Sequence, residues 1–350
     1  MRNSKSVIIV GAGASHEAGL PVGAGLKNDI SRILKHREIS GHYGTEVNDE
    51  LISYALSIIS SQGYDINSLK QACEHISDAM PQVISIDNFI DTHKGNEAIE
   101  KCGKIAIVRS ILSAEKNSKL YVNLNNIYNK PNYEQLESTW FNTFWQLMTE
   151  NCQENELESR FSSVSLIVFN YDRCIEHFLY YSLKNVYRLN DEKAAKIVNS
   201  IPIYHPYGVV GNLPWQNKQD SINFGGVPDH HLLVRLASKI KTFTEGTDPD
   251  SSEVSEIRNS ILTAEIVLFL GFAFHKLNMK LITPDHSVGK GAKHTSYFAT
   301  ATGVSDSDIN EIKNEIKSLS KSGKFDISLR NDKKCYDIFH EYKRSLLLYY

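Results

Sequence analysis

The sequence is poor in cysteine, and its cysteines are not grouped. No two of them form a CxxC pair, so there is no indication of a zinc knuckle or a redox motif, and we expect buried, reduced thiols. The five cysteines are Cys73, Cys102, Cys152, Cys174 and Cys335. The histidines show no HExxH or comparable spacing, and the adjacent His230 and His231 are weak evidence for a ligand pair. We therefore predict that the protein holds no metal.

Long apolar runs and an excess of one charge are also missing. No stretch approaches the roughly 18 apolar residues of a membrane span, and the polar first residues lead directly into "VIIVGAG" without a signal-peptide core. The 38 Lys and Arg residues nearly balance the 41 Asp and Glu residues, which gives a formal net charge of -3 and no broad basic field. We expect a cytoplasmic protein that does not cross a membrane, and the charge gives no indication that this chain binds nucleic acid by itself.

Strand-like and helix-like segments alternate along most of the chain. Apolar runs of strand length occur at residues 7–10 and within "SLIVFNYD", "IPIYHPYG", "AEIVLFLGFAF", "HTSYFAT" and "KFDISLR". The alternation predicts a parallel α/β sheet formed by residues 1–35 and 160–350, with an inserted, mainly helical subdomain at 36–159 that has almost no strong strand. A polar loop is predicted at 245–256, and a helical segment at the C-terminus.

A glycine turn follows the first strand in "SVIIVGAGASHEAGLPVGAGL", residues 6–26. Gly11 and Gly13 fit a strand-to-helix turn whose backbone N–H groups approach a pyrophosphate at a helix N-terminus. His16 replaces the third glycine of the dinucleotide fingerprint, and no acidic strand end follows about 20 residues later. Both departures argue against a dehydrogenase. The turn alone is explained equally well as a structural feature.

The residues after this turn have more than one interpretation. Ser15 either caps the following turn or contacts a phosphate oxygen. Pro21 lies in "GLPVG", where a helix would normally continue, so the loop is longer than the usual dinucleotide-binding turn.

Polar or glycine residues also mark three later strand ends. Asn170 and Asp172 end "SLIVFNYD", and His205 follows "IPIY". Gly271 and Phe272 follow "IVLFL". Because ligands bind beyond the carboxyl ends of parallel strands, near a topological switch point, we expect these residues to converge. Asn170 needs a partner or a purpose if it is buried, whereas Asp172 is explained equally as a helix N-cap and His205 as a structural histidine.

Asp87 and Asn88 form a further polar pair in "SIDNF". They either face the pocket or cap a helix N-terminus, and the cap is the favoured interpretation.

Taken together, "VGAGASHEAGLPVG", "SIDNFIDTHKGN", "FNYD", "IYHPYG" and "LFLGFAFHKLN" resemble the motifs of the sirtuin-related NAD-hydrolase domains found in bacterial antiphage defence systems. The resemblance covers nearly the whole chain, and it implies a Rossmann-like parallel sheet with helices on both faces and a helical insertion. It implies that Asn170 and His205 are the catalytic residues and that Asp172 contacts the nicotinamide-ribose side of NAD+. The other residues that it assigns to the cofactor site are Gly11, Ala12, Gly13, Ser15, Pro21, Gly271 and Phe272.

The activity implied by this resemblance is hydrolysis of NAD+, as substrate, to nicotinamide and ADP-ribose. Our hypothesis is that Asn170 orients the ribose and the attacking water, that His205 is the general base, and that Asp172 holds the nicotinamide or the loop. Because unrestrained NAD+ cleavage would kill the host, we expect gating by assembly or by a partner. We expect a homo-oligomer that works with a separately encoded defence partner, for example a hexameric DNA-translocating ATPase.

Two departures from the sirtuins narrow this expectation. The Phe-Arg pair of their cofactor loop is absent from "GLPVGAG", and their four-cysteine zinc module is missing. Protein deacylation is therefore not expected. Two alternatives stay open, namely a module that binds NAD or ADP-ribose without cleaving it, and a sirtuin-type transferase.

Overall fold

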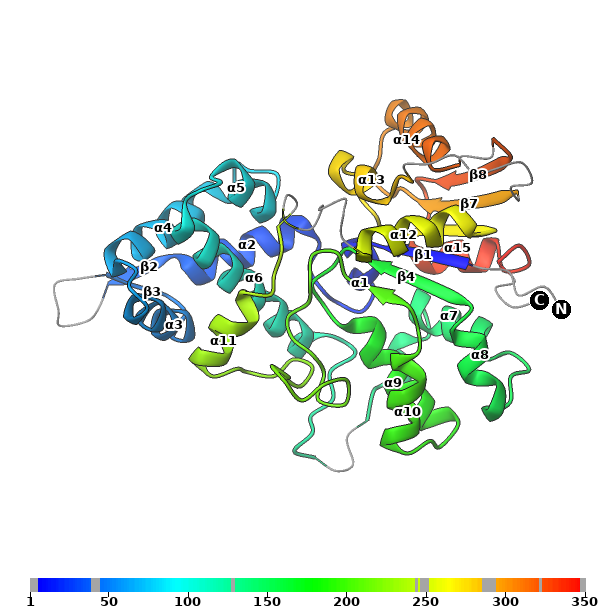
Figure 1. The fold of residues 1–350 in the computed structure, drawn as a ribbon, viewed down its shortest axis with the longest axis horizontal. Coiled ribbons are helices and arrows are strands. Elements are labelled where there is room, and N and C mark those ends of the chain that lie inside the picture. The colour runs from blue at the N-terminus through cyan, green and yellow to red at the C-terminus, as the bar shows by residue number, and fades with distance from the viewer. Residues whose placement is uncertain are drawn as a thin grey trace.

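The structure is a computed structural model, and it describes residues 6–38, 45–126, 130–242, 245, 252–284, 294–320 and 323–346. The first five residues, the last four residues of the predicted C-terminal helical segment and part of the loop predicted at 245–256 lie outside these ranges. A mainly helical lobe and a lobe built around a sheet lie side by side (Figure 1).

The sheet lobe contains one parallel sheet of six strands, in the order β5-β4-β1-β6-β7-β8. When these six strands are counted along the chain, their order across the sheet is 3-2-1-4-5-6, which is the Rossmann order. The predicted Rossmann-like α/β class and the predicted strand segments are therefore confirmed. The bounds are β1 (Ser6–Val10), β4 (Val164–Val168), β5 (Ile203–Tyr204), β6 (Ile266–Leu270), β7 (Thr295–Thr300) and β8 (Phe325–Arg330).

The central strand β1 is buried on both faces. Ile8 is paired with Leu166 of β4 on one side and with Leu268 of β6 on the other. Because side chains alternate along a strand, Ile8 belongs to one hydrophobic cluster and Val7 and Ile9 belong to the other. Strands that are covered on both faces have continuous apolar sequences. These runs are the reason why the strands could be predicted from the sequence.

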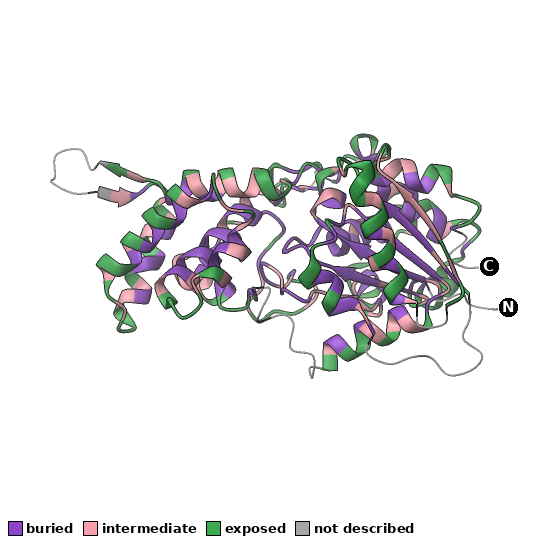
Figure 2. Cartoon of the chain, turned by 90° about the horizontal axis from the view of Figure 1, so that it is seen from above, coloured by how far each residue is buried: buried purple, intermediate pink, exposed green. Residues whose placement is uncertain are grey.

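Helices cover both faces of the sheet, as predicted, and Figure 2 shows buried residues along the strands and on the inner sides of the helices. The elements of this lobe are α1 (Ala12–His16), η1 (Tyr133–Leu136), α7 (Trp140–Thr149), η2 (Glu154–Glu156), α8 (Leu157–Phe161), α9 (Cys174–Val186), α10 (Asp191–Asn199), α12 (Ser252–Thr263), α13 (Lys276–Ile282), α14 (Asp306–Leu319) and α15 (Cys335–Glu341). The buried residues of α7, α9 and α15 pack in one cluster, and those of α12, α13 and α14 pack in the other.

The helical lobe combines segments from distant parts of the chain. Its helices are α2 (Gly23–Leu34), α3 (Glu50–Ser61), α4 (Ile66–Ala79), α5 (Ile86–Thr92), α6 (Glu97–Asn117) and α11 (His230–Ala237). Helix α2 packs against α4 and α6, and α11, which follows β5, packs against α3 and α6. In contrast, α7 lies within the predicted insertion and packs against α9 and α15. The insertion boundaries at 36 and 159 stay a prediction.

A small antiparallel pair, β2 (His36–Glu38) and β3 (Thr45–Val47), lies at the start of the predicted helical region. The sequence predicts almost no strong strand in this region. Strands of three residues are too short to show the period-2 pattern by which strands are recognised.

Candidate functional site

A cavity lies at the carboxyl ends of β1, β4 and β6. It has a volume of about 960 Å³, including its open mouth, and it is lined by residues after these strands together with residues of α2, α5 and α6. The chain leaves β1 toward β4 on one side and later returns to β6 on the other, so the cavity lies at the switch point of the sheet. Ligands of open α/β sheets bind at this position.

The glycines of two turns let the backbone after β1 contact the backbone after β6. Gly11 N–H donates to Leu270 O at 2.9 Å, and Gly13 N–H donates to Gly271 O at 3.0 Å. A Cβ on Gly11 would lie 2.5 Å from Gly271 O, and a Cβ on Gly271, whose φ is +55°, would lie 2.1 Å from Ala14 N. The amides of Gly11 and Gly13 therefore already donate within the protein, and a pyrophosphate contact by other N–H groups of this turn stays a prediction.

Asn170 ties the end of β4 to the first turn. Its Nδ2 donates to Gly11 O at 3.1 Å and to Ser15 Oγ at 2.8 Å, and the side chain is buried while it lines the cavity. A carbonyl oxygen can only accept, so Nδ2 must face Gly11 and Oδ1 lies on the other side of the planar amide. Ser15 accepts this bond, does not line the cavity and does not cap α1, whose N-cap Gly11 makes no side-chain bond.

Asp172 has both a local structural contact and a place at the cavity. Its Oδ1 accepts a hydrogen bond from Cys174 N at 3.1 Å, which orders the start of α9, although the N-cap itself is Arg173. Burial raises the pKa of the Asp172 carboxyl, while hydrogen bonds from Cys174 and from Ser15 oppose that shift. The side chain is buried and lines the cavity.

His205 does not line the cavity. Its Nε2 donates to Glu176 Oε1 at 2.9 Å, and its Nδ1 lies 3.4 Å from the backbone oxygen of Asn170. Burial lowers the pKa of His205, but the charge of Glu176 and these hydrogen bonds outweigh burial, so the pKa is raised. Both neighbours are acceptors, which favours the doubly protonated ring. The residue contacts the backbone of Asn170, whose side chain lines the cavity.

Asp87 does line the cavity, and the favoured interpretation of it as a helix cap is wrong. The N-cap of α5 is Ser85, whose Oγ accepts from Asn88 N at 3.1 Å, and Asp87 lies in the first turn behind it. The Tyr171 hydroxyl donates to Asp87 Oδ1. Burial raises the pKa of Asp87 to about 6, although the Tyr171 hydrogen bond opposes the shift. The serine one position before "IDNF" was the sequence signal for the cap.

Aromatic side chains form much of the remaining wall. Phe169 packs against Tyr207 and Phe272 with ring centroids 5.6 Å and 5.1 Å apart, and all three residues line the cavity. Lys27 also lines it, and its Nζ donates to Val83 O at 2.5 Å.

Six of the ten predicted site residues line the cavity, and four do not. The lining residues are Gly11, Ala12, Pro21, Asn170, Asp172 and Phe272. The residues outside the lining are Gly13, Ser15, Gly271 and His205.

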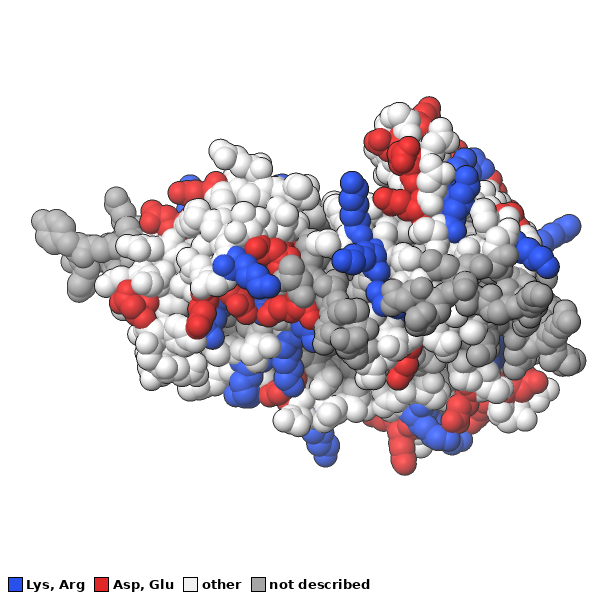
Figure 3. Space-filling model, turned by 45° about the horizontal axis from the view of Figure 1, so that its top comes forward, with Lys and Arg blue, Asp and Glu red and all other residues white. Residues whose placement is uncertain are grey.

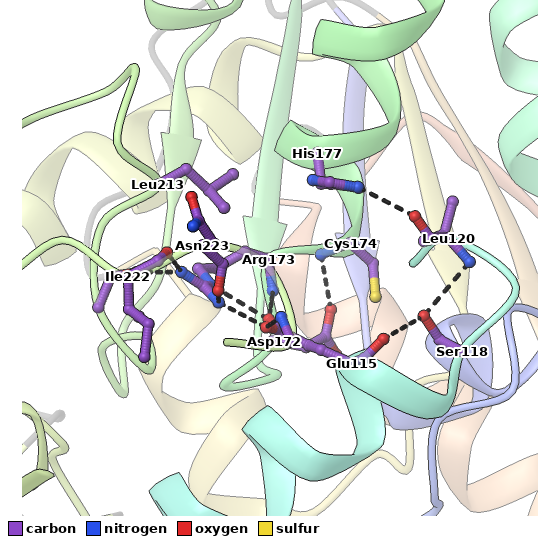
Figure 4. Close-up of polar contacts among 12 residues, drawn as sticks. Glu115, Ser118, Leu120, Asp172, Arg173, Cys174, His177, Leu213, Ile222 and Asn223 are labelled. Atoms are coloured by element: carbon purple, nitrogen blue, oxygen red, sulfur yellow. Dashed lines mark hydrogen bonds and ion pairs between the residues drawn. The ribbon is translucent and has the colours of Figure 1, made fainter. Parts of the chain in front are cut away.

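A buried ion pair lies behind the turn that carries Asp172 (Figure 4). Arg173 Nε donates to Glu115 Oε1 at 3.0 Å, and a second bond joins Nη2 to Oε2 at 2.5 Å. Arg173 Nη1 also donates to Ile222 O at 2.7 Å, while Gly225 N donates to Glu115 Oε2 at 2.9 Å. The pair therefore joins α6, the start of α9 and the long connection after β5.

The geometry defines a Rossmann-like α/β protein with a cavity at the switch point of its sheet. The sequence matches no protein-family model and no curated protein. Across the described residues, His, Cys, Asp and Glu side chains form no group of three or more that could hold a metal ion. None of the helices in the described part of the chain combines the length and apolarity needed to cross a bilayer.

Proposed function

We propose that this protein is an NAD+ glycohydrolase that cleaves NAD+ to nicotinamide and ADP-ribose. The observation that carries the proposal is the cavity at the switch point. Asn170, Asp172 and Asp87 line this cavity together with aromatic side chains. Carboxylate and amide oxygens are suitable acceptors for ribose hydroxyls, and an aromatic surface suits a nicotinamide or adenine ring. The motif resemblance supplies the choice of NAD+ among possible nucleotides.

The polar groups of the cavity suit the charge that develops in this reaction. Cleavage of the nicotinamide glycosidic bond builds positive charge at the ribose C1′ and ring oxygen, and fixed carboxyl and amide oxygens stabilise such charge. Oδ1 of Asn170 is the free end of an amide whose Nδ2 is held by Gly11 and Ser15, so its direction is fixed before substrate arrives. His205 acts on the site through the Asn170 backbone in this proposal.

The biological setting proposed with this activity is antiphage defence in the cytoplasm. NAD+ depletion on infection would be gated by homo-oligomer assembly or by a separately encoded partner such as a hexameric DNA-translocating ATPase. The motif resemblance supports this setting.

A second candidate is a module that binds NAD or ADP-ribose without cleaving it. It is favoured by one observation, namely that the ring of His205 is paired with Glu176 and does not line the cavity. A protein that lacks an aligned base would hold the dinucleotide and leave it intact.

Nicotinamide and ADP-ribose release separates the two candidates. Purified chain is incubated with NAD+, alone and with the product of the neighbouring gene, beside Asn170→Ala and the matched exposed control Asn314→Ala on α14. We expect release by wild type and by the control, and a loss of about 100-fold or more in Asn170→Ala. A melting curve of each variant checks the fold, because Asn170 also binds Gly11 and Ser15. Tight NAD+ binding with no product under any condition would support the binding module and contradict the hydrolase.

A further inference from the structure

The cavity contains a carboxyl group whose position suits proton transfer better than that of His205. Asp87 lines the cavity and its side chain is buried. Its Oδ1 accepts a hydrogen bond from the hydroxyl of Tyr171, the residue that follows Asn170. His205 lies outside the lining, with Nε2 directed at Glu176 and Nδ1 near the Asn170 carbonyl. A general base must reach the proton that it removes directly or through one water.

The local fold explains how Asp87 reaches this place. Ser85 caps α5, so the first turn of this short helix is ordered and Asp87 projects from it at the end of β4. Helix α5 lies close to α6, since a Cβ on Gly103 would lie 2.7 Å from Ile90 Cδ1. The helical lobe therefore supplies a carboxyl group to a cavity that also contains Asn170 and Asp172, which follow β4 of the sheet.

The other titratable groups of the cavity are less suited to accept a proton. Lys27 is a donor that already binds Val83 O, and Asp172 Oδ1 is held by Cys174 N. His275 lines the cavity but is exposed, whereas Asp87 is buried. Asp87 and Asp172 are the buried carboxyl groups among these lining residues. Asp172 accepts hydrogen bonds from Cys174 and Ser15, whereas Asp87 accepts one from Tyr171, so Asp87 is the less constrained of the two.

We propose that Asp87, rather than His205, is the general base of the hydrolysis, an inference that rests on the proposed function. The bond between ribose C1′ and the nicotinamide nitrogen breaks, and its electron pair goes to that nitrogen, which neutralises the pyridinium. A water oxygen forms the new bond to C1′, and one of its protons passes to the Asp87 carboxylate. The products are neutral nicotinamide, ADP-ribose and one proton, which Asp87 later releases to solvent.

The surroundings of Asp87 suit this role near neutral pH. Burial raises its pKa to about 6, the Tyr171 hydrogen bond opposes the rise, and the charge of Asp91 on the same helix adds to it. The charge of Asp87 in turn contributes to the raised pKa values of Tyr171 and Tyr207. A base with this pKa is mostly ionised at pH 7 and still accepts a proton readily.

The test is the pH profile of nicotinamide release by purified variants, with NAD+ affinity measured in parallel. Asp87→Asn should lower kcat by about 100-fold or more, change NAD+ affinity only a few-fold and lose the acid limb of the profile near pH 6. Tyr171→Phe removes the hydrogen bond that lowers the Asp87 pKa, so the acid limb should move to higher pH while activity persists. Asp78→Asn, on the exposed side of α4, is the matched control and should behave as wild type.

Three outcomes contradict this assignment. Asp87→Asn with wild-type kcat would overturn it, as would an unchanged acid limb in Asp87→Asn. A profile whose acid limb disappears in His275→Gln and persists in Asp87→Asn would assign the base to His275. Absence of product with wild type itself, alone and with the partner, would instead refute the hydrolase proposal on which the inference rests. Asp87→Asn keeps the side-chain volume and an oxygen acceptor for Tyr171, and Tyr171→Phe gives an independent readout if it does not fold.

Discussion

The buried pair of Glu115 and Arg173 gives a quantitative prediction about stability. Both side chains are almost completely inaccessible, with 0% and 1% of their surface exposed. Replacing Glu115 by Gln keeps its shape but leaves the guanidinium buried without a counter-charge. Removing one partner of such a pair costs about 3–5 kcal/mol of unfolding free energy. We expect Glu115→Gln to fall in this range at pH 7.

The opposite substitution should cost less, and its cost should depend on pH. Burial raises the pKa of Glu115, and Arg173 opposes the shift. In Arg173→Met this opposition is lost, so the buried Glu115 binds a proton more tightly when folded than when unfolded. A group with a raised folded pKa stabilises the fold at low pH, and this stability is lost as pH rises. Arg173→Met should therefore be closer to wild type at pH 5 than at pH 8.

Urea unfolding of both single variants and of the double variant Glu115→Gln/Arg173→Met measures the coupling directly. Because the double variant contains no unpaired buried charge, its loss should be clearly smaller than the sum of the two single losses. Asp65→Asn, at the exposed N-terminus of α4, controls for the loss of a carboxylate outside the core. The reasoning is refuted if either single variant loses less than about 1 kcal/mol at pH 7, or if the two losses add.

Further predictions concern the glycine turn and two buried titratable groups. Gly271→Ala should lose several kcal/mol of unfolding free energy in urea, because φ is +55° and the new Cβ would lie 2.1 Å from a backbone nitrogen. Gly303→Ala, where φ is +83° and the new Cβ would lie in open space, should lose only about 1 kcal/mol. Equal losses would contradict the close-contact explanation. Asp87→Asn should raise the unfolding free energy by up to about 3 kcal/mol at pH 8, since the Asp87 pKa of about 6 exceeds the reference value of 3.8 by about two units. The gain should vanish below pH 4, where the carboxyl group is neutral in both states. A difference that does not depend on pH would exclude the raised pKa as its cause. Burial lowers the pKa of His177 to about 3. As pH decreases below 6.5, this residue should therefore lower the unfolding free energy of the wild type by about 1.4 kcal/mol per pH unit. His177→Gln should reduce that slope in urea unfolding at several pH values.

The strands of the sheet could be predicted because each central strand is a continuous apolar run. "SVIIV" and "IVLFL" are recognisable without knowledge of their neighbours, and the parallel α/β class follows from their alternation with helices. The order of the strands is a different matter. The contact between Gly11 and Gly271 joins residues 260 positions apart, and a local pattern does not specify such a pairing.

The strand-end argument located part of the candidate site but not His205, which directly follows β5 and lies outside the cavity lining. Asn170 and Asp172 follow β4 and line the cavity, as the strand-end argument expects. The orientation of His205 depends on Glu176, which lies in another element and 29 residues away. Asp87 was assigned to a cap because a carboxylate near a helix start usually serves there. The preceding Ser85 was the available signal that this role is taken, whereas only the fold shows that Asp87 accepts a hydrogen bond from Tyr171.

Helix α11 makes residues 36–159 dependent on a later part of the chain. It belongs to the chain after β5, yet its buried residues Leu233 and Leu236 pack in the same cluster as residues of α3 and α6. A version of the protein that lacked residues 36–159 would leave this leucine face in water, and a transplanted 36–159 would have an open groove where α11 had been. Residues 36–159 are therefore not an interchangeable cassette, and changes in them during evolution must preserve a surface that fits a helix from the chain after β5.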